Sequence, residues 1–399
     1  MNYVEQSQAA GRHVFPDLTR AFALIGIVLV NVGAIAFPMM KGFIDGGLNT
    51  PLDQAAMFST TAFFLLKSYT LFSFMFGVGF AYQMQSAERH GTGFAGRYWR
   101  RIFGLLVLGL LHVALLFQGD ILVMYAILGS ILFLFRKSTV KTLKRWAISI
   151  YSFQVVLVGF GALAVAMAQK YVPEEMAIEI EVMKDSVIES RAVFGEGTFI
   201  ESVSLRFAEW SEIIIFGMMI QGFGALAFFL FGLAAVRADI ISNPSAPIWK
   251  KFRRIFLPIG IAGSLAAAYV FSTAGDMMGP KMMLAMALVT LFAPFSTAGY
   301  LGLIAKWAEG PMTPFKTFIA RGGTASLTAY LMQGLILSLI FNNYGLGLYR
   351  EIGAAGCVLI ALLTGIFTVS FTSLWRKKFT RGPMEYLLRS WTYWGTNKN

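Results

Sequence analysis

The sequence contains one cysteine, three histidines and few charged residues, and these shortages exclude several classes of protein. Cys357 alone cannot form an intrachain disulfide, so a disulfide-stapled scaffold is excluded. Charged residues make up 14% of the chain, whereas soluble domains carry about a quarter. That polar surface is too small to cover a water-soluble globule of 399 residues.

Hydrophobic residues make up 57% of the chain and the mean hydropathy is +0.65, which predicts an all-α, polytopic integral membrane protein. A helix needs about 20 largely apolar residues to cross the hydrocarbon core. We expect a single membrane domain over residues 1–399, with a first helix that is retained rather than cleaved as a signal peptide. About ten transmembrane helices are predicted, over residues 22–40, 57–83, 102–117, 121–135, 147–168, 213–236, 255–271, 282–304, 325–341 and 353–374.

Basic residues outnumber acidic ones by 33 to 21, a net charge of +12, and their positions predict the orientation. If the N-terminus is cytoplasmic, 25 of the 33 Lys and Arg residues fall in cytoplasmic loops or tails. Such a bias is characteristic of the cytoplasmic side of membrane proteins. We therefore expect both termini to be cytoplasmic, with a basic cytoplasmic tail over residues 375–399. Because topology explains the charge, no nucleic acid partner is expected.

Residues 170–212 interrupt the hydrophobic pattern with ten acidic and four basic side chains. Pro173 followed by Glu174 and Glu175 is typical of a helix N-terminus, because proline is tolerated in the first turn and acids favour the positive end of the dipole. Apolar residues at positions 176, 180, 183 and 187 share one helical face. We expect an extracytoplasmic amphipathic helix lying on the membrane surface. A lid over an opening on that side is the alternative.

His112 is the only histidine inside a predicted span, and Asp120 follows it by eight residues. If the helix continues to Asp120, the two side chains share a face. A histidine beside a carboxylate is a candidate general base, because the carboxylate fixes the imidazole tautomer and raises its basicity. The alternatives are a packing role for His112 and helix capping by Asp120. The other histidines, His13 and His90, fall in segments expected to be cytoplasmic, so no metal site is predicted.

Three further polar positions lie in or next to the first two predicted spans. Lys67 either extends to the outer interface or is buried beside an anionic partner. Asn31 could form a hydrogen bond between helices. Asp17 and Arg20, three residues apart, are expected to form a local ion pair at the start of the first span.

Five motifs follow one another along nearly the whole chain. They are D-L-T-R-A-F-A-L-I-G-I with Asn31 (residues 17–31), F-S-F-M-F-G-V-G (72–79), R-R…G-L-L-H…G-D-I-L…Y-A (100–126), S-L-T-A-Y-L-M-Q (326–333) and G-P-M-E…R (382–389). Together these motifs resemble the YeiB-like family (domain of unknown function 418). Three positions differ from the family pattern: Ala21 replaces Gly, Ala329 replaces Asn and Gly334 replaces Ser.

This family is distantly similar to transmembrane acyltransferases of the acyltransferase-3 and heparan-glucosaminide acetyltransferase type. The resemblance implies a multi-pass protein of a bacterial inner membrane that moves an acyl group from a cytoplasmic CoA-type donor to an acceptor on the outer side. The histidine of the acyltransferase-3 first helix corresponds here to Asn31, so His112 would have to supply the base. No tightly bound cofactor is expected, and acyl-CoA would be a co-substrate.

The sequence thus carries two hypotheses. In the first, His112 deprotonates a hydroxyl or amine of a small-molecule, lipid or glycan acceptor and Asp120 orients the imidazole. Arg20, Arg97, Arg100 and Arg101 then hold the phosphates of the donor, because guanidinium groups match phosphate geometry. In the second, the protein is a transporter or lipid-handling protein without chemistry, in contact with membrane lipids. The oligomeric state is not predicted.

Both hypotheses place the polar groups of the spans around one cavity, because lipid offers them no hydrogen-bond partners. We expect this cavity to be lined by the first, second, third and ninth spans, with His112 on its wall. Asp120 is expected nearer the outer mouth, about 12 Å from His112 along the helix. The other lining candidates are Arg20, Asn31, Lys67, Ser73, Thr328, Tyr330 and Gln333.

Overall fold

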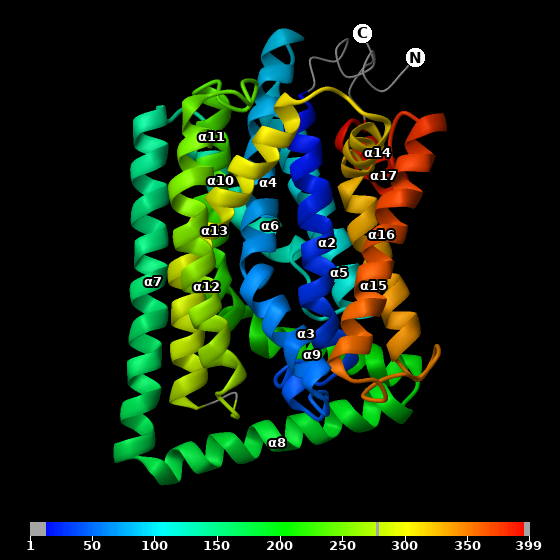
Figure 1. Ribbon diagram of the computed structural model, residues 1–399. Helices are drawn as coiled ribbons and strands as arrows, with labels where there is room; N and C mark the ends of the chain where they lie inside the picture. The colour runs from blue at the N-terminus through cyan, green and yellow to red at the C-terminus, as the bar shows by residue number, and fades with distance from the viewer. Residues whose placement is uncertain (1–12, 277–278, 395–399) are drawn as a thin grey trace.

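The computed structural model describes residues 13–276 and 279–394, which form an all-helical bundle (Figure 1). Its main helices are α2 (Val14–Ala36), α3 (Pro51–Phe63), α4 (Lys67–Arg89), α5 (Phe94–Leu115), α6 (Leu122–Leu132), α7 (Val140–Tyr171), α8 (Pro173–Glu196), α9 (Phe199–Gly217), α10 (Phe223–Arg237), α11 (Pro247–Lys251), α12 (Leu257–Ser272), α13 (Pro280–Glu309), α14 (Pro314–Gly323), α15 (Ser326–Phe341), α16 (Ala354–Lys378) and α17 (Pro383–Thr392). Single π-helical turns join α9 to α10 and α11 to α12.

Each of the ten predicted stretches falls on one helix or on two consecutive helices. Among the described residues, eight helices are long and apolar enough to cross a membrane, or nine if the bent pair α14 and α15 is one span. Helix α6 has 11 residues and is too short by this measure. The first helix begins at Val14 rather than residue 22, so Asp17 and Arg20 lie inside it. The protein is a helical, multi-pass membrane protein.

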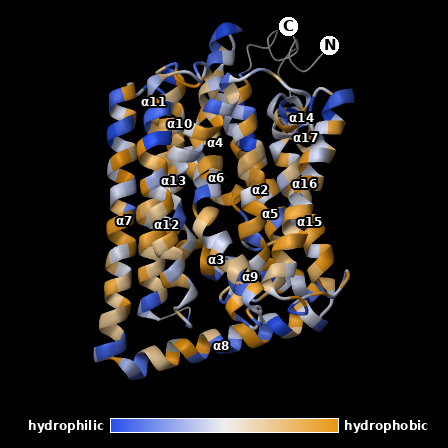
Figure 2. Cartoon of the chain, in the orientation of Figure 1, coloured by the Kyte–Doolittle hydropathy of each residue, from blue (hydrophilic) through white to orange (hydrophobic). Residues whose placement is uncertain are grey.

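The two ends of the bundle differ in their connections. The loops that follow α4, α6, α10, α13 and α16 lie at the end that carries α11, α14 and α17, which we call the α17 end (Figure 1). Helix α8 lies across the opposite end, which we call the α8 end. Figure 2 shows that hydrophilic residues are concentrated toward these ends. The basic loops predicted to share one side of the membrane therefore lie at one end of the bundle.

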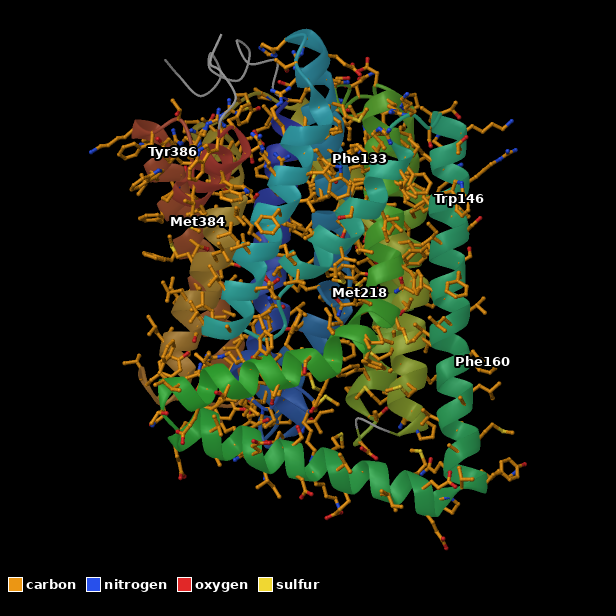
Figure 3. All side chains as sticks on the ribbon, turned by 180° about the vertical axis from the view of Figure 1, so that it is seen from behind. Phe133, Trp146, Phe160, Met218, Met384 and Tyr386 are labelled. Carbon is orange, nitrogen blue, oxygen red and sulfur yellow. The ribbon has the colours of Figure 1, made fainter. Side chains whose placement is uncertain are left out.

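Helices pack closely inside the bundle, whereas α7 forms one of its edges. A Cβ at Gly77 of α4 would lie 2.0 Å from the backbone oxygen of Phe229 on α10, so only glycine permits this approach. Gly77 thus serves helix packing, as its place within a span predicts. On α7, Trp146 and Phe160 are exposed at the outside of the bundle (Figure 3). An exposed apolar edge of this kind is suited to contact with lipid.

A break between α3 and α4 explains the position of Lys67. Leu66 adopts a left-handed backbone conformation with φ of 62°, and this residue ends the helical continuity of the second predicted span. The side chain of Lys67 is fully buried, and its Nζ donates to the carbonyl oxygen of Thr61 at 3.0 Å. The ammonium thus stabilises the negative end of α3. Extension of Lys67 to the interface was therefore a wrong interpretation.

A second break separates α14 from α15, which meet at 79°. The first turn of α15 has backbone N–H groups without partners in its own helix. Glu385 of α17 accepts hydrogen bonds there from the backbone N–H groups of Leu327 and Thr328, at 2.7 and 3.2 Å, and from the Thr328 hydroxyl at 2.6 Å. The last two family motifs are therefore in contact: Glu385 of the fifth motif caps α15, and α15 carries the fourth motif.

We expect the Glu385→Ala substitution to destabilise the protein by about 2–4 kcal/mol, because it leaves two partly buried N–H groups without an acceptor. The measurement is the melting temperature of the purified protein in detergent. Glu309→Ala is the matched control: Glu309 forms an exposed ion pair with Lys306, which contributes little. Equal melting temperatures for the two variants would contradict the capping role.

The acidic segment over residues 170–212 forms α8 and most of α9. Helix α8 begins at Pro173 with Glu174 and Glu175 in its first turn, as the sequence predicts. Met183 and Val187 are buried, and Arg191 pairs with Asp45 in the loop after α2. The acidic segment was expected to lie on the surface, but its Glu209 does not. It is buried and accepts hydrogen bonds from Ser190 and Gln118, so it joins α8 and α9 to the α5–α6 turn.

Candidate functional site at a buried histidine–aspartate pair

His112 and Asp120 form a buried pair toward the α8 end. Helix α5 ends at Leu115, and the chain then turns back before α6 starts at Leu122. This reversal brings Asp120 Oδ1 to 2.9 Å from His112 Nδ1. The two side chains are 1% and 0% exposed, respectively. The expected pairing is present, but the continuous helix and the 12 Å separation were wrong, because a turn rather than helix rise connects the residues.

Asp120 accepts three hydrogen bonds. Its Oδ2 accepts from the backbone N–H of Val123 at 2.9 Å, and its Oδ1 accepts from His112 and from the Tyr330 hydroxyl at 3.3 Å. Asp120 therefore both accepts a first-turn N–H of α6 and orients the histidine, two roles that the sequence left compatible with each other. Because an ionised carboxylate only accepts, the Nδ1 atom of His112 must carry the proton. When the imidazole is neutral, its lone pair therefore lies on Nε2.

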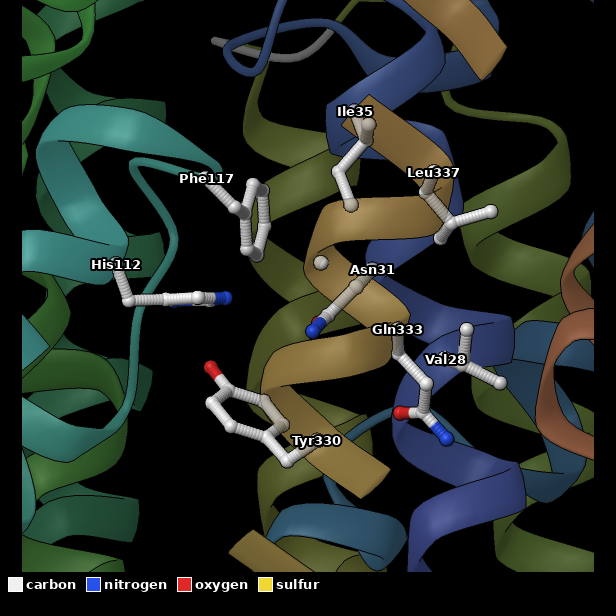
Figure 4. Close-up of a pocket in the computed structure, with 9 residues that line it drawn as sticks. Val28, Asn31, Ile35, His112, Phe117, Tyr330, Gln333 and Leu337 are labelled. Atoms are coloured by element: carbon white, nitrogen blue, oxygen red, sulfur yellow. The ribbon is translucent and has the colours of Figure 1, made fainter. Parts of the chain in front are cut away.

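A small pocket lies in front of Nε2 (Figure 4). It is enclosed by α2, α5, the turn after α5 and α15, and it has room for roughly one water molecule. Asn31, His112, Tyr330 and Gln333 supply its polar atoms, and Val28, Ile35, Phe117 and Leu337 supply apolar walls. The first, third and ninth predicted spans thus meet at one pocket. The second span does not line it.

Two buried atoms at this pocket have no hydrogen-bond partner within the described part of the chain: Nε2 of His112 and Oε1 of Gln333. The amide nitrogen of Gln333 donates to Leu24 O and to the Thr368 hydroxyl, which fixes its oxygen as the free atom. Both free atoms are acceptors. Buried polar atoms rarely remain unpaired, so the pocket is suited to a ligand group that donates hydrogen bonds, such as a hydroxyl or an amine.

Gly334 makes room for the imidazole. A Cβ at this position would lie 2.3 Å from His112 Nε2, closer than any unstrained contact. The family pattern, as the resemblance gives it, has serine here together with the histidine, so the structure does not explain why this chain has glycine.

The other predicted site residues lie away from the pocket. Ser73 contacts the Tyr125 hydroxyl at 2.7 Å, and Thr328 contacts Glu385. Arg20 pairs with Asp17 at 2.9 Å near the start of α2, as expected. The three arginines of α5 lie in its first three turns, at the α17 end.

Two of these arginines contact the C-terminal segment of the described chain. Arg100 donates to the carbonyl oxygen of Trp394 at 2.5 Å, and the guanidinium of Arg97 lies 5.4 Å from the Tyr393 ring. Arg101 is half-buried and forms no hydrogen bond with a described residue. Among residues 13–276 and 279–394, no group of three or more His, Cys, Asp or Glu side chains could hold a metal ion.

Comparison with known proteins decides the family. The profile described as a protein of unknown function (DUF418) matches residues 235–395. The chain is also 30% identical over 392 residues to the uncharacterized protein YxaH of Bacillus subtilis (strain 168), which covers 94% of this chain and 93% of that protein. The chain belongs to the DUF418 family. The resemblance drawn from the five motifs is thereby confirmed.

Other relatives of this DUF418 protein extend over similar lengths. The uncharacterized protein YeiB of Escherichia coli (strain K12) is 27% identical over 402 residues, covering 96% of both chains. A 39.9 kDa protein of Bacillus acidopullulyticus, named from the amylase 3' region, is 24% identical over 390 residues. No solved structure matches the chain. The segment that matches the DUF418 profile includes Tyr330, Gln333 and Glu385, whereas His112 and Asp120 lie before that segment.

Proposed function

We propose that this DUF418 protein is a membrane acyltransferase in which His112 is the general base. One observation carries the proposal: the imidazole is held by Asp120 with its free Nε2 at a pocket that lacks only a hydrogen-bond donor. An acceptor hydroxyl or amine would fill that position. A general base must lie within hydrogen-bond reach of the proton it removes, and a group in this pocket meets that condition.

The proposed step conserves atoms and charge. The proton of the acceptor O–H or N–H moves to Nε2, and the acceptor atom forms a bond to the acyl carbon of the CoA thioester. The carbon–sulfur bond breaks, and the leaving thiolate takes the proton from the imidazolium. Asp120 stabilises the imidazolium while it exists, and Tyr330 and Val123 keep the carboxylate in place.

The donor would approach from the α17 end, where Arg20, Arg97, Arg100 and Arg101 lie. An anionic CoA is attracted to basic loops, and positive-inside orientation makes that end cytoplasmic. Arg20 and Asn31 are both on α2 and are 11 residues apart, which corresponds to about 16 Å of helix. The acyl group would therefore travel roughly half the membrane thickness before it meets the acceptor in the half of the bundle toward α8.

The test is acyl turnover by the purified full chain in vesicles of phosphatidylethanolamine and phosphatidylglycerol. Acyl-labelled acetyl-CoA and palmitoyl-CoA are supplied separately, and free thiol and labelled product are measured. We expect thiol release matched by label transfer to a hydroxyl or amine. Movement of label across the vesicle membrane without thiol release would refute the proposal and favour the transporter alternative.

A further inference from the structure

A second pocket adjoins the first on its α8 side. It lies between the ends of α2 and α5, the turn after α5, and helices α8 and α9. Ile35 and Phe117 line both pockets, so these two side chains form the partition between them. We call this second space the vestibule. Its polar side chains are Gln118, Arg206 and Asn342, which are 4%, 1% and 3% exposed, respectively.

Arg206 brings to the vestibule a guanidinium that forms no ion pair with a described carboxylate. Its guanidinium donates to the carbonyl oxygen of Leu115 at 3.3 Å and to the Tyr344 hydroxyl at 2.6 Å, and it lies over the rings of Phe194 and Tyr344. No carboxylate of the described chain lies within ion-pair distance of it. A buried cation is costly without an anionic partner. Three of the five N–H groups of the Arg206 guanidinium make no hydrogen bond to a described residue and can donate to such a partner.

Glu209, one turn further along α9, interacts with this charge through space but does not bond to the guanidinium. Its two carboxylate oxygens accept from Ser190 and Gln118 instead. The hydrogen bond to Gln118 uses the amide nitrogen of that residue, and Asn342 likewise donates from its nitrogen to the carbonyl oxygen of Ser338. The amide oxygens of Gln118 and Asn342 are left as acceptors. The vestibule thus combines a cation for an anionic group with acceptors for hydroxyl groups.

We infer that the vestibule binds a phosphoglycerol-type group, with Arg206 on the phosphate and with hydroxyls at Gln118 and Asn342. This inference rests on the proposed function, since it names the acceptor class: a hydroxylated phosphate ester that enters from the α8 end. A hydroxyl of the same group would pass between Ile35 and Phe117 to reach His112 Nε2. Each pocket has room for roughly one water molecule, so the group is admitted only when the Phe117 ring, which lines both pockets, moves aside and joins them.

Binding, measured without acyl donor, tests the inference separately from the chemistry. The full chain is purified in detergent and titrated with dihexanoyl phosphatidylglycerol, dihexanoyl phosphatidylcholine and glycerol 3-phosphate, with intrinsic tryptophan fluorescence as the readout. We expect phosphatidylglycerol to bind in preference to phosphatidylcholine, which has the phosphate but no hydroxyls. Binding of phosphatidylglycerol alone identifies a lipid as the source, whereas binding of glycerol 3-phosphate as well identifies a site open to soluble esters.

Arg206→Gln should weaken phosphatidylglycerol binding roughly ten- to hundredfold, since it removes a charge-assisted hydrogen bond. Arg191→Gln is the matched control, because Arg191 lies on α8 outside the vestibule and its partner Asp45 retains Arg350. Ala34 lines the vestibule, so Ala34→Leu fills it without removing a hydrogen bond and should have the same effect if Arg206→Gln does not fold.

Unchanged affinity in folded Arg206→Gln or Ala34→Leu, or equal affinity for the two lipids, would overturn the inference. His112→Ala should bind phosphatidylglycerol as the unsubstituted protein does. A His112→Ala variant that binds the lipid and still transfers acyl groups would refute the proposed base but not the inference that the vestibule binds the lipid.

Discussion

Replacement of His112 by alanine is expected to reduce acyl transfer by roughly 10²- to 10⁴-fold, the usual effect of removing a general base. The remaining rate would come from positioning of donor and acceptor. Asp120→Asn should give a comparable loss, because an amide NH₂ at this position would favour the tautomer with the proton on Nε2. The measurement is the initial rate of thiol release from the acyl-CoA that the unsubstituted protein uses, in the same vesicles.

His90→Ala is the matched control for the His112 substitution. His90 follows α4 at the α17 end, is exposed, and contacts only the carbonyl oxygen of Ser86 on its own helix. Its replacement should leave the rate unchanged. Because His112 is buried, elution of each variant as a single species and its melting temperature establish whether it is folded. Full activity in a folded His112→Ala protein would remove His112 from the mechanism.

Gly334→Ala is expected to reduce acyl transfer by about 10²-fold while the helix itself gains stability. Alanine favours α-helix over glycine by about 1 kcal/mol, so α15 should tolerate the change. The new methyl group, however, would lie 2.3 Å from His112 Nε2 and must displace the imidazole from the pocket. A displacement of about 1 Å at a reacting group is sufficient for a loss of this size.

Gly159→Ala provides the comparison for this second substitution. Gly159 is inside α7, and no atom lies within 4 Å of a Cβ built there. The same chemical change should therefore leave the rate as it was. If Gly334→Ala and Gly159→Ala have equal rates, then the space above Gly334 is not needed for catalysis, and the contact with His112 has only a packing role.

Hydrophobic run length predicted where the helices lie, because burial in lipid depends on composition more than on tertiary contacts. Run length did not predict how the helices end. Leu66 changes the chain direction inside an apolar stretch, and nothing in the residue types marks this position. The turn after Leu115, in contrast, coincides with Gln118, Gly119 and Asp120, the gap between the predicted spans over residues 102–117 and 121–135. The count of ten spans stays a prediction: α6 has 11 residues and is too short to qualify by its own length, although the loops before α5 and after α6 lie at the same end of the bundle.

The pairing of His112 with Asp120 was predictable because few ionisable groups occur inside the spans, and such groups are less costly when they pair with each other. The gap between the third and fourth predicted spans indicated the chain reversal, but helix rise gave the wrong distance between the two side chains. Arg206 was missed because its segment was interpreted as a solvated acidic surface. Its apolar neighbours, such as Leu205, were the available sign that α9 is partly buried. Tyr330 and Gln333 were predicted only through the family motif.

The cap that Glu385 provides for α15 has a consequence for biogenesis. Glu385 is 58 residues after Leu327, and a ribosome adds about 5–20 residues per second. For roughly 3–12 seconds after Leu327 is made, the first turn of α15 therefore has no acceptor for its N–H groups. Unpaired N–H groups are costly in a membrane, so the insertion machinery or lipid headgroups must hold this end until α17 arrives. Helix α17, which is synthesised after the broken span that carries Tyr330, Gln333 and Gly334, thus fixes that span in its final position.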